Sequence, residues 1–341
     1  MTLRWTTRPK GSTWGDFGPD DELGRLNLLT PEKVKQGVAE VREGITFCLS
    51  LPLDLPGGNS LNPRRHPPKL SPTVRANGRP NMNFPVCEEV DGATDVICDD
   101  RVVLYLQYST QWDSLAHVGS LYDADEAGLR PTFYNGFRGG HDIVGPSTVG
   151  EADRPSRARR LGVERMAEHG MQGRAVMIDL RAHLGDAKQA VGCDTLARIM
   201  DADGVVVEPG DMVCLHTGFA EHLIAMRGEP DPNRVHDLCA GLDGRDQKLL
   251  DWITRSGLCA LIADNYAVEV YPAGPGPACC ASLPLHEHCL FKLGVNLGEL
   301  WHLTPLAEWL RARGRNRFLL TAPPLRLPGA VGSPATPIAT V

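Results

Sequence analysis

The residues best suited to chemistry lie in one stretch of this sequence, from Gln107 to His117. Gln107, Gln111 and Asp113 each carry an oxygen that can bind a metal ion, at spacings of four and two residues. His117 follows four residues later, and the ordinary pKa of histidine, about 6.5, suits proton transfer near neutral pH. These residue types predict that Asp113 binds a divalent metal and that His117 moves a proton. The alternative is a turn in which the side chains only hydrogen-bond locally.

A second group of candidate ligands, His286, His288 and Glu299, lies far along the sequence. Imidazole and carboxylate groups both bind divalent metals, so this group could complete a site around Asp113. If His286 and Glu299 converge on Asp113, a single glutamine would suffice as a further ligand. Which of the two histidines binds the metal is open, and the other would then be an ordinary surface side chain.

Three further residues are candidates for contact with a substrate. Asp264 and Asn265 follow a predicted strand over 259–263, and residues at the ends of strands often reach a site. Trp112 lies within the first motif, between Gln111 and Asp113, and is the third candidate. The sequence holds no Gly-x-Ser-x-Gly element for a serine nucleophile and no strand-Gly-x-Gly-x-x-Gly-helix pattern for a dinucleotide.

The stretch from Gln107 to His117 resembles the signature of the cyclase family, His-x-Gly-Thr-His-x-Asp-x-Pro-x-His. This family includes bacterial kynurenine formamidase, isatin hydrolase and a group of dienelactone hydrolases. The alignment places Gln107 and Gln111 at the two metal-ligand histidines, Asp113 at the aspartate ligand, and His117 at the last histidine, which acts as acid and base. Ser109 and Leu115 replace the glycine and the proline of the signature.

Other segments resemble the family in the same order along the chain. They match an N-terminal stretch of a longer branch, two apolar strands, and a C-terminal His…Gly…Glu segment that supplies further ligands. These segments are Trp14-Gly15-Asp16 with residues 23–32, residues 173–179, residues 210–219, and His286 with Gly294 and Glu299. Together they cover most of the 341 residues.

The resemblance implies a compact α/β domain, built around a mixed, barrel-like sheet flanked by helices. It implies a metal-dependent hydrolase of a cyclic amide, lactone or aryl formamide, with Asp113, His286, Glu299 and the glutamines as ligands. An amide oxygen is a harder ligand than imidazole, so the glutamines weaken zinc binding and favour Mn²⁺ or Mg²⁺. The expected cofactor is one divalent ion: Mn²⁺, or the Zn²⁺ that a histidine-rich site would prefer.

Two further expectations follow from the resemblance. The protein is expected to form homodimers or homotetramers that exchange N-terminal arms. The alternative function, from another class, is a metal-free protein that kept the fold. Such a protein would bind a small molecule, or act as a lyase or cyclase through His117 alone. In that case Gln107 and Gln111 would only hydrogen-bond to the substrate or to Asp113.

Composition excludes several classes of partner. With 35 Lys and Arg against 42 Asp and Glu, the formal charge is −7, and no basic patch stands out for nucleic acid. No apolar run approaches the roughly 20 residues that span a bilayer, and the first residues lack the apolar core of a signal peptide. The ten cysteines are scattered, so we read them as reduced and mostly buried thiols of a cytoplasmic protein.

The elements expected around the motifs suggest one catalytic domain. Residues 1–50 are predicted to form an N-terminal arm, a helix over 31–42 and a strand over 44–51, and residues 51–341 the remainder of the domain. The Pro- and Gly-rich stretch 55–86 is predicted to be a long loop, either a lid or an arm on a neighbouring subunit. Further strands are predicted at 101–106 (buried), 174–180, 211–216 and 259–263, and helices at 158–169, 193–202, 219–227, 245–256 and 303–313.

Overall fold

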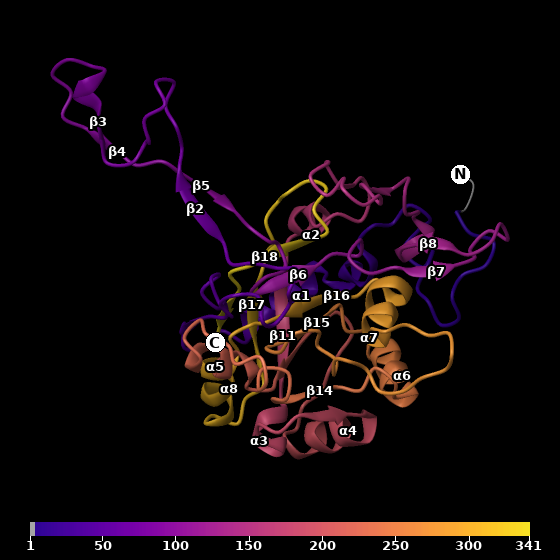
Figure 1. Ribbon diagram of the computed structural model, residues 1–341. Helices are drawn as coiled ribbons and strands as arrows, with labels where there is room; N and C mark the ends of the chain where they lie inside the picture. Colours follow the sequence, from indigo (N-terminus) through magenta and orange to yellow (C-terminus); the bar gives the residue numbers. More distant parts are fainter. Residues whose placement is uncertain (1–3) are drawn as a thin grey trace.

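A nine-stranded mixed sheet forms the centre of this computed structural model, which describes residues 4–341 (Figure 1). Four central strands run parallel, and the strands on either side of them pair antiparallel. In spatial order the strands are β1 (Thr46–Cys48), β19 (Ile338–Thr340), β17 (Arg317–Thr321), β11 (Gln172–Asp179), β13 (Met212–His216), β15 (Ala260–Ala263), β16 (Asn296–Glu299), β6 (Gln111–Asp113) and β18 (Gly332–Pro334).

Helices cover both faces of the sheet. The helical segments are η1 (Gly24–Leu28), α1 (Pro31–Ala39), η2 (Val86–Glu88), η3 (Tyr134–Gly136), α2 (Glu164–His169), α3 (Leu180–Leu184), α4 (Cys193–Ala202), α5 (Phe219–Ala225), α6 (Gln247–Ser256), α7 (Pro284–His286), η4 (Glu287–Leu293, a π-helix) and α8 (Thr304–Arg311). Side chains alternate along β11, so Val176 and Ile178 pack with α4 and α6, whereas Ala175 and Met177 pack with α8. Two cores therefore lie on the two sides of one sheet.

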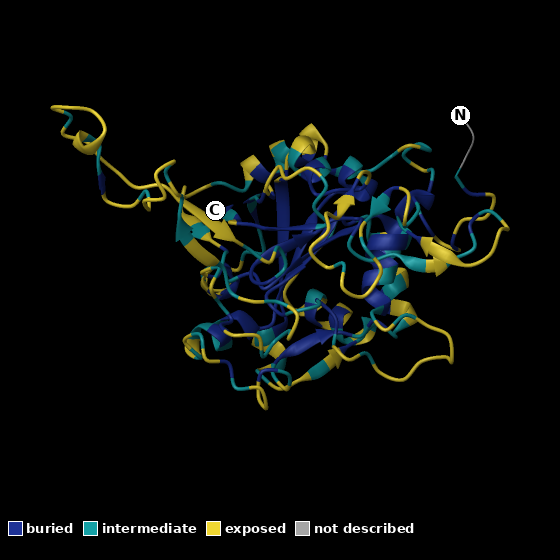
Figure 2. Ribbon diagram, turned by 45° about the horizontal axis from the view of Figure 1, so that its top comes forward, coloured by how far each residue is buried: buried dark blue, intermediate teal, exposed yellow. Residues whose placement is uncertain are grey.

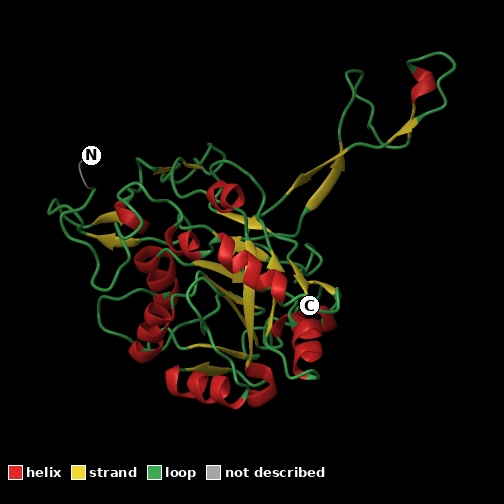
Figure 3. Cartoon of the chain, turned by 180° about the vertical axis from the view of Figure 1, so that it is seen from behind, coloured by secondary structure: helices red, strands yellow, loops and turns green. Residues whose placement is uncertain are grey.

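The predicted fold class, an α/β domain around a mixed, barrel-like sheet, is confirmed (Figure 3). The predicted strands at 174–180, 211–216 and 259–263 correspond to β11, β13 and β15, and the helix at 193–202 to α4. The helix predicted at 158–169 is shorter. Ala158 belongs to a strand and Leu161 has a φ of 62°, so the helix α2 begins only at Glu164.

Smaller two-stranded pairs surround the main sheet. They are β2 (Lys69–Pro72) with β5 (Asp100–Val103), β3 (Phe84–Pro85) with β4 (Val96–Ile97), β7 (Ser120–Tyr122) with β8 (Arg130–Thr132), β9 (Ile143–Val144) with β10 (Arg157–Ala158), and β12 (Gln189–Val191) with β14 (Ala240–Leu242). Within residues 4–341, no helix has the length and apolar character needed to cross a bilayer. Five cysteines are exposed, contrary to the prediction that most are buried.

The first two of these pairs form an arm, residues 66–104, that projects from the body of the molecule (Figures 1 and 2). The prediction of a buried strand at 101–106 is therefore wrong. A run of β-branched residues fits a buried strand or a hairpin equally well, and here no other element covers it, so all of β5 is exposed. The predicted loop 55–86 is also divided, because its first part lies on the body and its second part carries β2 and β3.

Residues 13–25, within the predicted N-terminal arm, pack against a distant part of the same chain. Trp14 is fully buried, and its Nε1 donates to the carbonyl oxygen of Phe291 at 2.7 Å. The amides of Thr13 and Arg25 donate to carbonyl oxygens of Lys292 and Gly294 at 3.0 and 2.7 Å. The segment therefore binds the carbonyl groups at the end of the π-helix η4, which an isolated helix would leave without partners.

Candidate active site

The candidate site begins with the pairing of two short strands. In the antiparallel register of β6 and β16, Gln111 lies directly opposite Glu299. Neighbours across a strand pair share a face, and the Gln111 amide nitrogen donates to Glu299 Oε2 at 3.0 Å. Residues two apart in a strand also share a face, so Asp113 lies beside them. Strand pairing therefore gathers two carboxylates and one amide on one side of the sheet.

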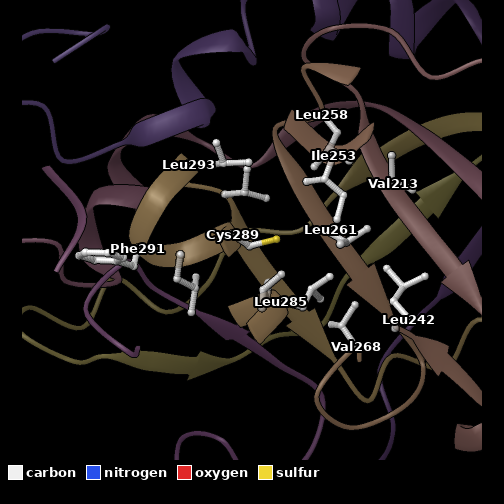
Figure 4. Packing of buried hydrophobic residues seen from close by; sticks show 14 of the residues in the cluster. Val213, Leu242, Ile253, Leu258, Leu261, Val268, Leu285, Cys289, Phe291 and Leu293 are labelled. Atoms are coloured by element: carbon white, nitrogen blue, oxygen red, sulfur yellow. The ribbon is translucent and has the colours of Figure 1, made fainter. Parts of the chain in front are cut away.

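His286 reaches the same point from a helix. It ends α7, and the apolar residues that follow Leu285 along the helix pack into the buried cluster around Leu261 (Figure 4). Glu269 accepts the backbone amide of His286 at 3.1 Å and lies 2.9 Å from its Nδ1. The other ring nitrogen, Nε2, is 3.2 Å from Glu299 Oε1 and 3.9 Å from Asp113 Oδ2. Glu269 thus fixes the ring so that Nε2 faces the carboxylates.

Asp113, His286 and Glu299 converge closely, because one ligand atom from each lies within 4.8 Å of the others. We call these three residues, with Gln111, the floor. All four are buried. The prediction that His286 and Glu299 lie with Asp113 therefore agrees with the geometry.

Burial and charge shift the ionisation of the floor. Burial, and then the charge of Glu299, raise the pKa of Asp113 to about 8. Burial also opposes a charged His286, but the carboxylates of Glu269 and Glu299 outweigh it and raise the pKa of His286 to about 10. Burial likewise opposes ionisation of Glu299, yet His286 lowers its pKa. In the protein alone, His286 pairs most closely with Glu299, whereas Asp113 lies 3.9 Å from the imidazole and has no hydrogen-bond partner among residues 4–341.

The floor fits a divalent cation. Both carboxylate oxygens of Asp113 and the Oε1 of Gln111 are buried without a hydrogen-bond partner among residues 4–341. A buried oxygen without a partner is costly, because it has lost its water and gained no donor. Two carboxylates, one amide oxygen and one imidazole form an oxygen-rich donor set, which suits Mn²⁺ or Mg²⁺ better than a histidine-rich set does.

His117 lies beside the floor and is held by Gln107. Its Nε2 is 3.8 Å from Asp113 Oδ1, and its Nδ1 is 3.1 Å from the side-chain nitrogen of Gln107. Burial, and then the nearby charge of His286, lower the pKa of His117 to about 4. The ring is therefore neutral near pH 7 and able to accept a proton. Gln107 contacts His117 rather than the carboxylates.

A cavity of about 380 Å³ opens above these residues, within the size range of small-molecule sites. Part of the 55–86 stretch forms one wall, and a tyrosine-rich loop forms another. The lining residues are Pro56, Asn59, Leu61, Asn62, Pro63, Arg64, Arg65, Gln107, Tyr108, His117, His236, Tyr266, Ala267, Tyr271, Leu283, His286, Glu299 and Leu300. Sequence reasoning missed the arginines, His236 and Glu269, since none belongs to a motif. It came close at Tyr266, which directly follows Asn265.

Two predicted residues lie away from the cavity. Trp112 points to the opposite face of β6, where it is fully buried against Trp301, and its Nε1 donates to Ala322 at 2.7 Å. The period of a strand explains this, because a residue between two ligands must face the other way. His288 is buried too, with Nε2 2.9 Å from the hydroxyl of Thr254. His286 is therefore the histidine at the floor, and His288 is not a surface side chain.

Asp264 and Asn265 support the backbone instead of lining the cavity. Asp264 is fully buried and accepts hydrogen bonds from the amides of Thr217 and Gly218, each at 2.7 Å. The Asn265 amide donates to the carbonyl oxygen of Ala240 at 3.0 Å. Both residues stand at the end of β15, as predicted, but they hold neighbouring loops in place and are not among the residues that line the cavity; their contact with a substrate stays a prediction.

This chain is similar in sequence to one protein family and in fold to several solved structures. A family model described as putative cyclase matches residues 47–270. A crystal structure described as a novel cyclase has a TM-score of 0.75 at 29% sequence identity, over 97% of both chains. No curated protein matches the chain in sequence.

Two isatin hydrolases share the fold at lower identity. Isatin hydrolase A from Ralstonia solanacearum has a TM-score of 0.55 at 15% identity, over 91% of this chain and 97% of that one. The enzyme of the same name from Labrenzia aggregata, bound to benzyl benzoate, has a TM-score of 0.54 at 13% identity, over 91% and 98%. At such identities the likeness shows the fold alone.

Proposed function

We propose a function from the premise that this chain belongs to the cyclase family, whose model matches more than half of it. In this proposal the protein is a metal-dependent hydrolase that opens a cyclic amide or a lactone, or cleaves an aryl formamide. The isatin hydrolases that share its fold are named for hydrolysis of a cyclic amide, which supports this choice of bond.

One observation carries the proposal: the buried oxygens of Asp113 and Gln111 lack partners and lie beside His286 and Glu299 under a small-molecule cavity. A cation would supply the missing partner for these oxygens, and the cavity above them would hold an uncharged carbonyl group. The arrangement joins a cation-binding floor to a neutral histidine, which are the two parts that hydrolysis by activated water requires.

Asp113, His286 and Glu299, with the amide oxygen of Gln111, would hold the ion. A divalent ion in such a site polarises a carbonyl group and makes water more acidic. Glu269 holds Nδ1 of His286, so that Nε2 faces the floor, which is the usual role of a carboxylate behind a histidine ligand. Glu269 is therefore a positioning residue in this proposal.

His117 would take a proton from the attacking water at Nε2 and return it to the leaving nitrogen or oxygen. This role requires a free Nε2, and the proton of the neutral ring must then lie on Nδ1. The Gln107 amide, next to Nδ1, has an oxygen that accepts a hydrogen bond and a nitrogen that donates one, and a half turn exchanges their positions. Gln107 can therefore support His117 in either tautomer, which gives it a positioning role.

A second candidate function is favoured by a specific contact. His286 already pairs with Glu299 at 3.2 Å, and Glu299 also accepts the amide of Gln111, so part of the floor is satisfied without an ion. A metal-free protein of this fold would bind a small molecule, or act as a lyase or cyclase through His117. It leaves the Asp113 oxygens unexplained, so it ranks second.

Metal analysis joined to a hydrolysis screen separates the two functions. Protein purified without chelator would be analysed for bound metals and tested on lactones, cyclic amides and N-formyl anilines. The first function predicts close to one divalent ion per chain and a rate that is lost with a chelator and restored by Mn²⁺ or Zn²⁺. Metal-free protein that keeps its full rate, or that only binds these compounds, would favour the second.

A further inference from the structure

Two arginines in the cavity wall have no acidic partner. Arg64 and Arg65 both line the cavity, and among residues 4–341 neither side chain forms an ion pair. One nitrogen of Arg65 donates to the backbone oxygen of Gln107, which leaves the other donors of its guanidinium group free for a ligand. By contrast, Arg174 is held by Asp211 through two hydrogen bonds. Arg64 is exposed and can be neutralised by water, whereas Arg65 is half-buried, so the unpaired guanidinium of Arg65 is the group that calls for an anion.

The charges around the floor strengthen this requirement. Asp113 and Glu299 together balance a divalent ion, and a His286 that binds the ion is neutral, so Glu269 offsets one of the two arginine charges. Burial raises the pKa of Asp113 and the charge of Arg65 lowers it, so Arg65 acts on the floor electrostatically. With the ion bound, the two arginines give the cavity an excess of positive charge. A neutral substrate would leave that charge uncompensated.

The other walls define the rest of the ligand. Leu61, Tyr108, Tyr266, Tyr271 and Leu300 present apolar and aromatic surface to the cavity. His236 lies 3.0 Å from the Tyr266 hydroxyl and 3.2 Å from the backbone oxygen of Ser60, so these walls are tied together. The cavity therefore suits a compact ring with an anionic group on one side.

We propose that Arg65 binds a carboxylate of the substrate, distinct from the bond that is cleaved, and that the substrate is an aromatic or alicyclic acid. Arg65 is a specificity-determining residue, placed beside His117 and Glu299 by its bond to Gln107. A guanidinium binds a carboxylate through two parallel hydrogen bonds, which fixes the orientation of the ring as well as its charge. This inference rests on the proposed hydrolysis at the floor.

Matched pairs of compounds test it. 2-Formamidobenzoate and formanilide share the formamide bond and differ by a carboxylate, and phthalide and its ring carboxylates form a lactone pair. We expect kcat/KM to be about 10- to 100-fold higher for the acid of at least one pair, the range for a hydrogen bond to a charged group. Arg65→Ala should remove most of this ratio, mainly through KM, and Arg65→Lys should retain part of it. Arg154→Ala, which removes an exposed arginine outside the cavity, should leave the ratio unchanged.

Binding measurements separate this inference from the proposed function. Anthranilate and its neutral amide would be titrated against the purified protein, and against Arg65→Ala, by fluorescence. If no compound is hydrolysed but anthranilate binds and Arg65→Ala weakens it at least about 10-fold more than the amide, the hydrolase proposal fails and the anion site stands. Equal rates for acid and neutral compounds, or anthranilate binding that ignores Arg65, would overturn the inference.

Discussion

The floor and the arm place polar and apolar side chains in opposite ways. The floor buries two carboxylates, an amide and an imidazole, whereas the arm exposes apolar residues such as Leu70 (69% exposed) and Val103 (64%) (Figure 2). Each side chain of the floor is positioned by contacts within the same chain. The arm, a chain of two-stranded pairs, has no third layer in the residues described.

This difference indicates which part of the molecule makes all of its packing contacts within one chain, and which part leaves apolar side chains uncovered. A two-stranded hairpin is only marginally stable alone in water, and exposed valines and leucines favour burial against another surface. In the proposed function, the floor would need only a cation and a substrate. The predicted homodimer or homotetramer is still a prediction, and the arm, rather than the N-terminal segment, is the place to test it.

Removing Asp113 should have the largest effect, because its carboxylate is the one in the floor that has no hydrogen-bond partner among residues 4–341. We expect Asp113→Ala to lose its bound metal and at least about 10³-fold in rate, as several kcal/mol of charge stabilisation disappear. Metal analysis and initial rates measure both. If Asp113→Ala has normal metal content and a normal rate, then Asp113 does not belong to the site. The contrast between the floor and the arm would then no longer hold.

His117→Ala should retain the metal and lose about 10²–10⁴-fold in rate, the usual contribution of a general acid and base. The reason is that His117 stands beside Asp113 at 3.8 Å without belonging to the converging ligand group. Metal content and rate are again the measurements. Loss of metal, with the rate rescued by excess ion, would make His117 a ligand and enlarge the floor.

The pH dependence of stability should depend in part on His288, which lies two residues after His286 in the sequence. Burial lowers the pKa of His288 to about 4, below its ordinary 6.5. The unfolded chain therefore binds this proton first, and stability should fall as the pH drops from about 6.5 to 4, by roughly 3 kcal/mol at most. Chemical denaturation of His288→Asn should show a flatter profile over that window. An unchanged profile would place the titration elsewhere.

Restoring the family histidine should have a smaller effect, on metal preference. Gln111→His, alone and with Gln107→His, should raise zinc affinity about tenfold or more, because imidazole is the better zinc ligand and second-sphere changes alone alter affinity by 10- to 100-fold. Competition with a chelator measures it. Activity need not rise, since Gln111 now bonds to Glu299. Undetectable zinc binding in the double variant would favour the metal-free function.

Changes on the arm should matter least to the single chain. Leu70 and Val102 lie opposite each other across β2 and β5 and are 69% and 49% exposed, so replacing both with threonine should change stability by less than about 0.5 kcal/mol. If a second copy of the chain covers these two residues, light scattering should show a smaller particle for the double variant than for the wild type. Leu129→Thr, equally exposed but on the body, is the control. A large loss of stability without any change in particle size would mean that Leu70 and Val102 are packed within the single chain rather than exposed.

The sequence allowed some of the floor to be predicted, and the reasons are local. A spacing of two places Gln111 and Asp113 on one face of a strand, and the same rule should have directed Trp112 to the other. Glu299 lies opposite Gln111 because two strands far apart in the sequence pair in one register, and neither strand's own sequence predicts that register. The resemblance to a family supplied that pairing.

The errors also have physical causes. Val102 and Val103 are apolar and β-branched enough for a core strand, and only the absence of covering elements among the described residues makes β5 part of an exposed hairpin. Glu269 belongs to no motif, because its role depends on a helix that begins fifteen residues later in the chain, at Pro284. Arg65 is likewise one arginine in a polar stretch until the fold brings it to Gln107.

The attachment of residues 13–25 to the end of η4 has a consequence for the order of assembly. During synthesis Trp14 emerges long before Phe291, whose carbonyl oxygen is its partner, and β1 emerges long before β19. The earliest and latest segments must therefore find each other across most of the chain, and contacts of such sequence separation slow folding. Because η4 continues directly from His286, that closure also stabilises the helical segment that carries this histidine. We therefore expect the floor to be among the last parts of the newly made protein to become rigid.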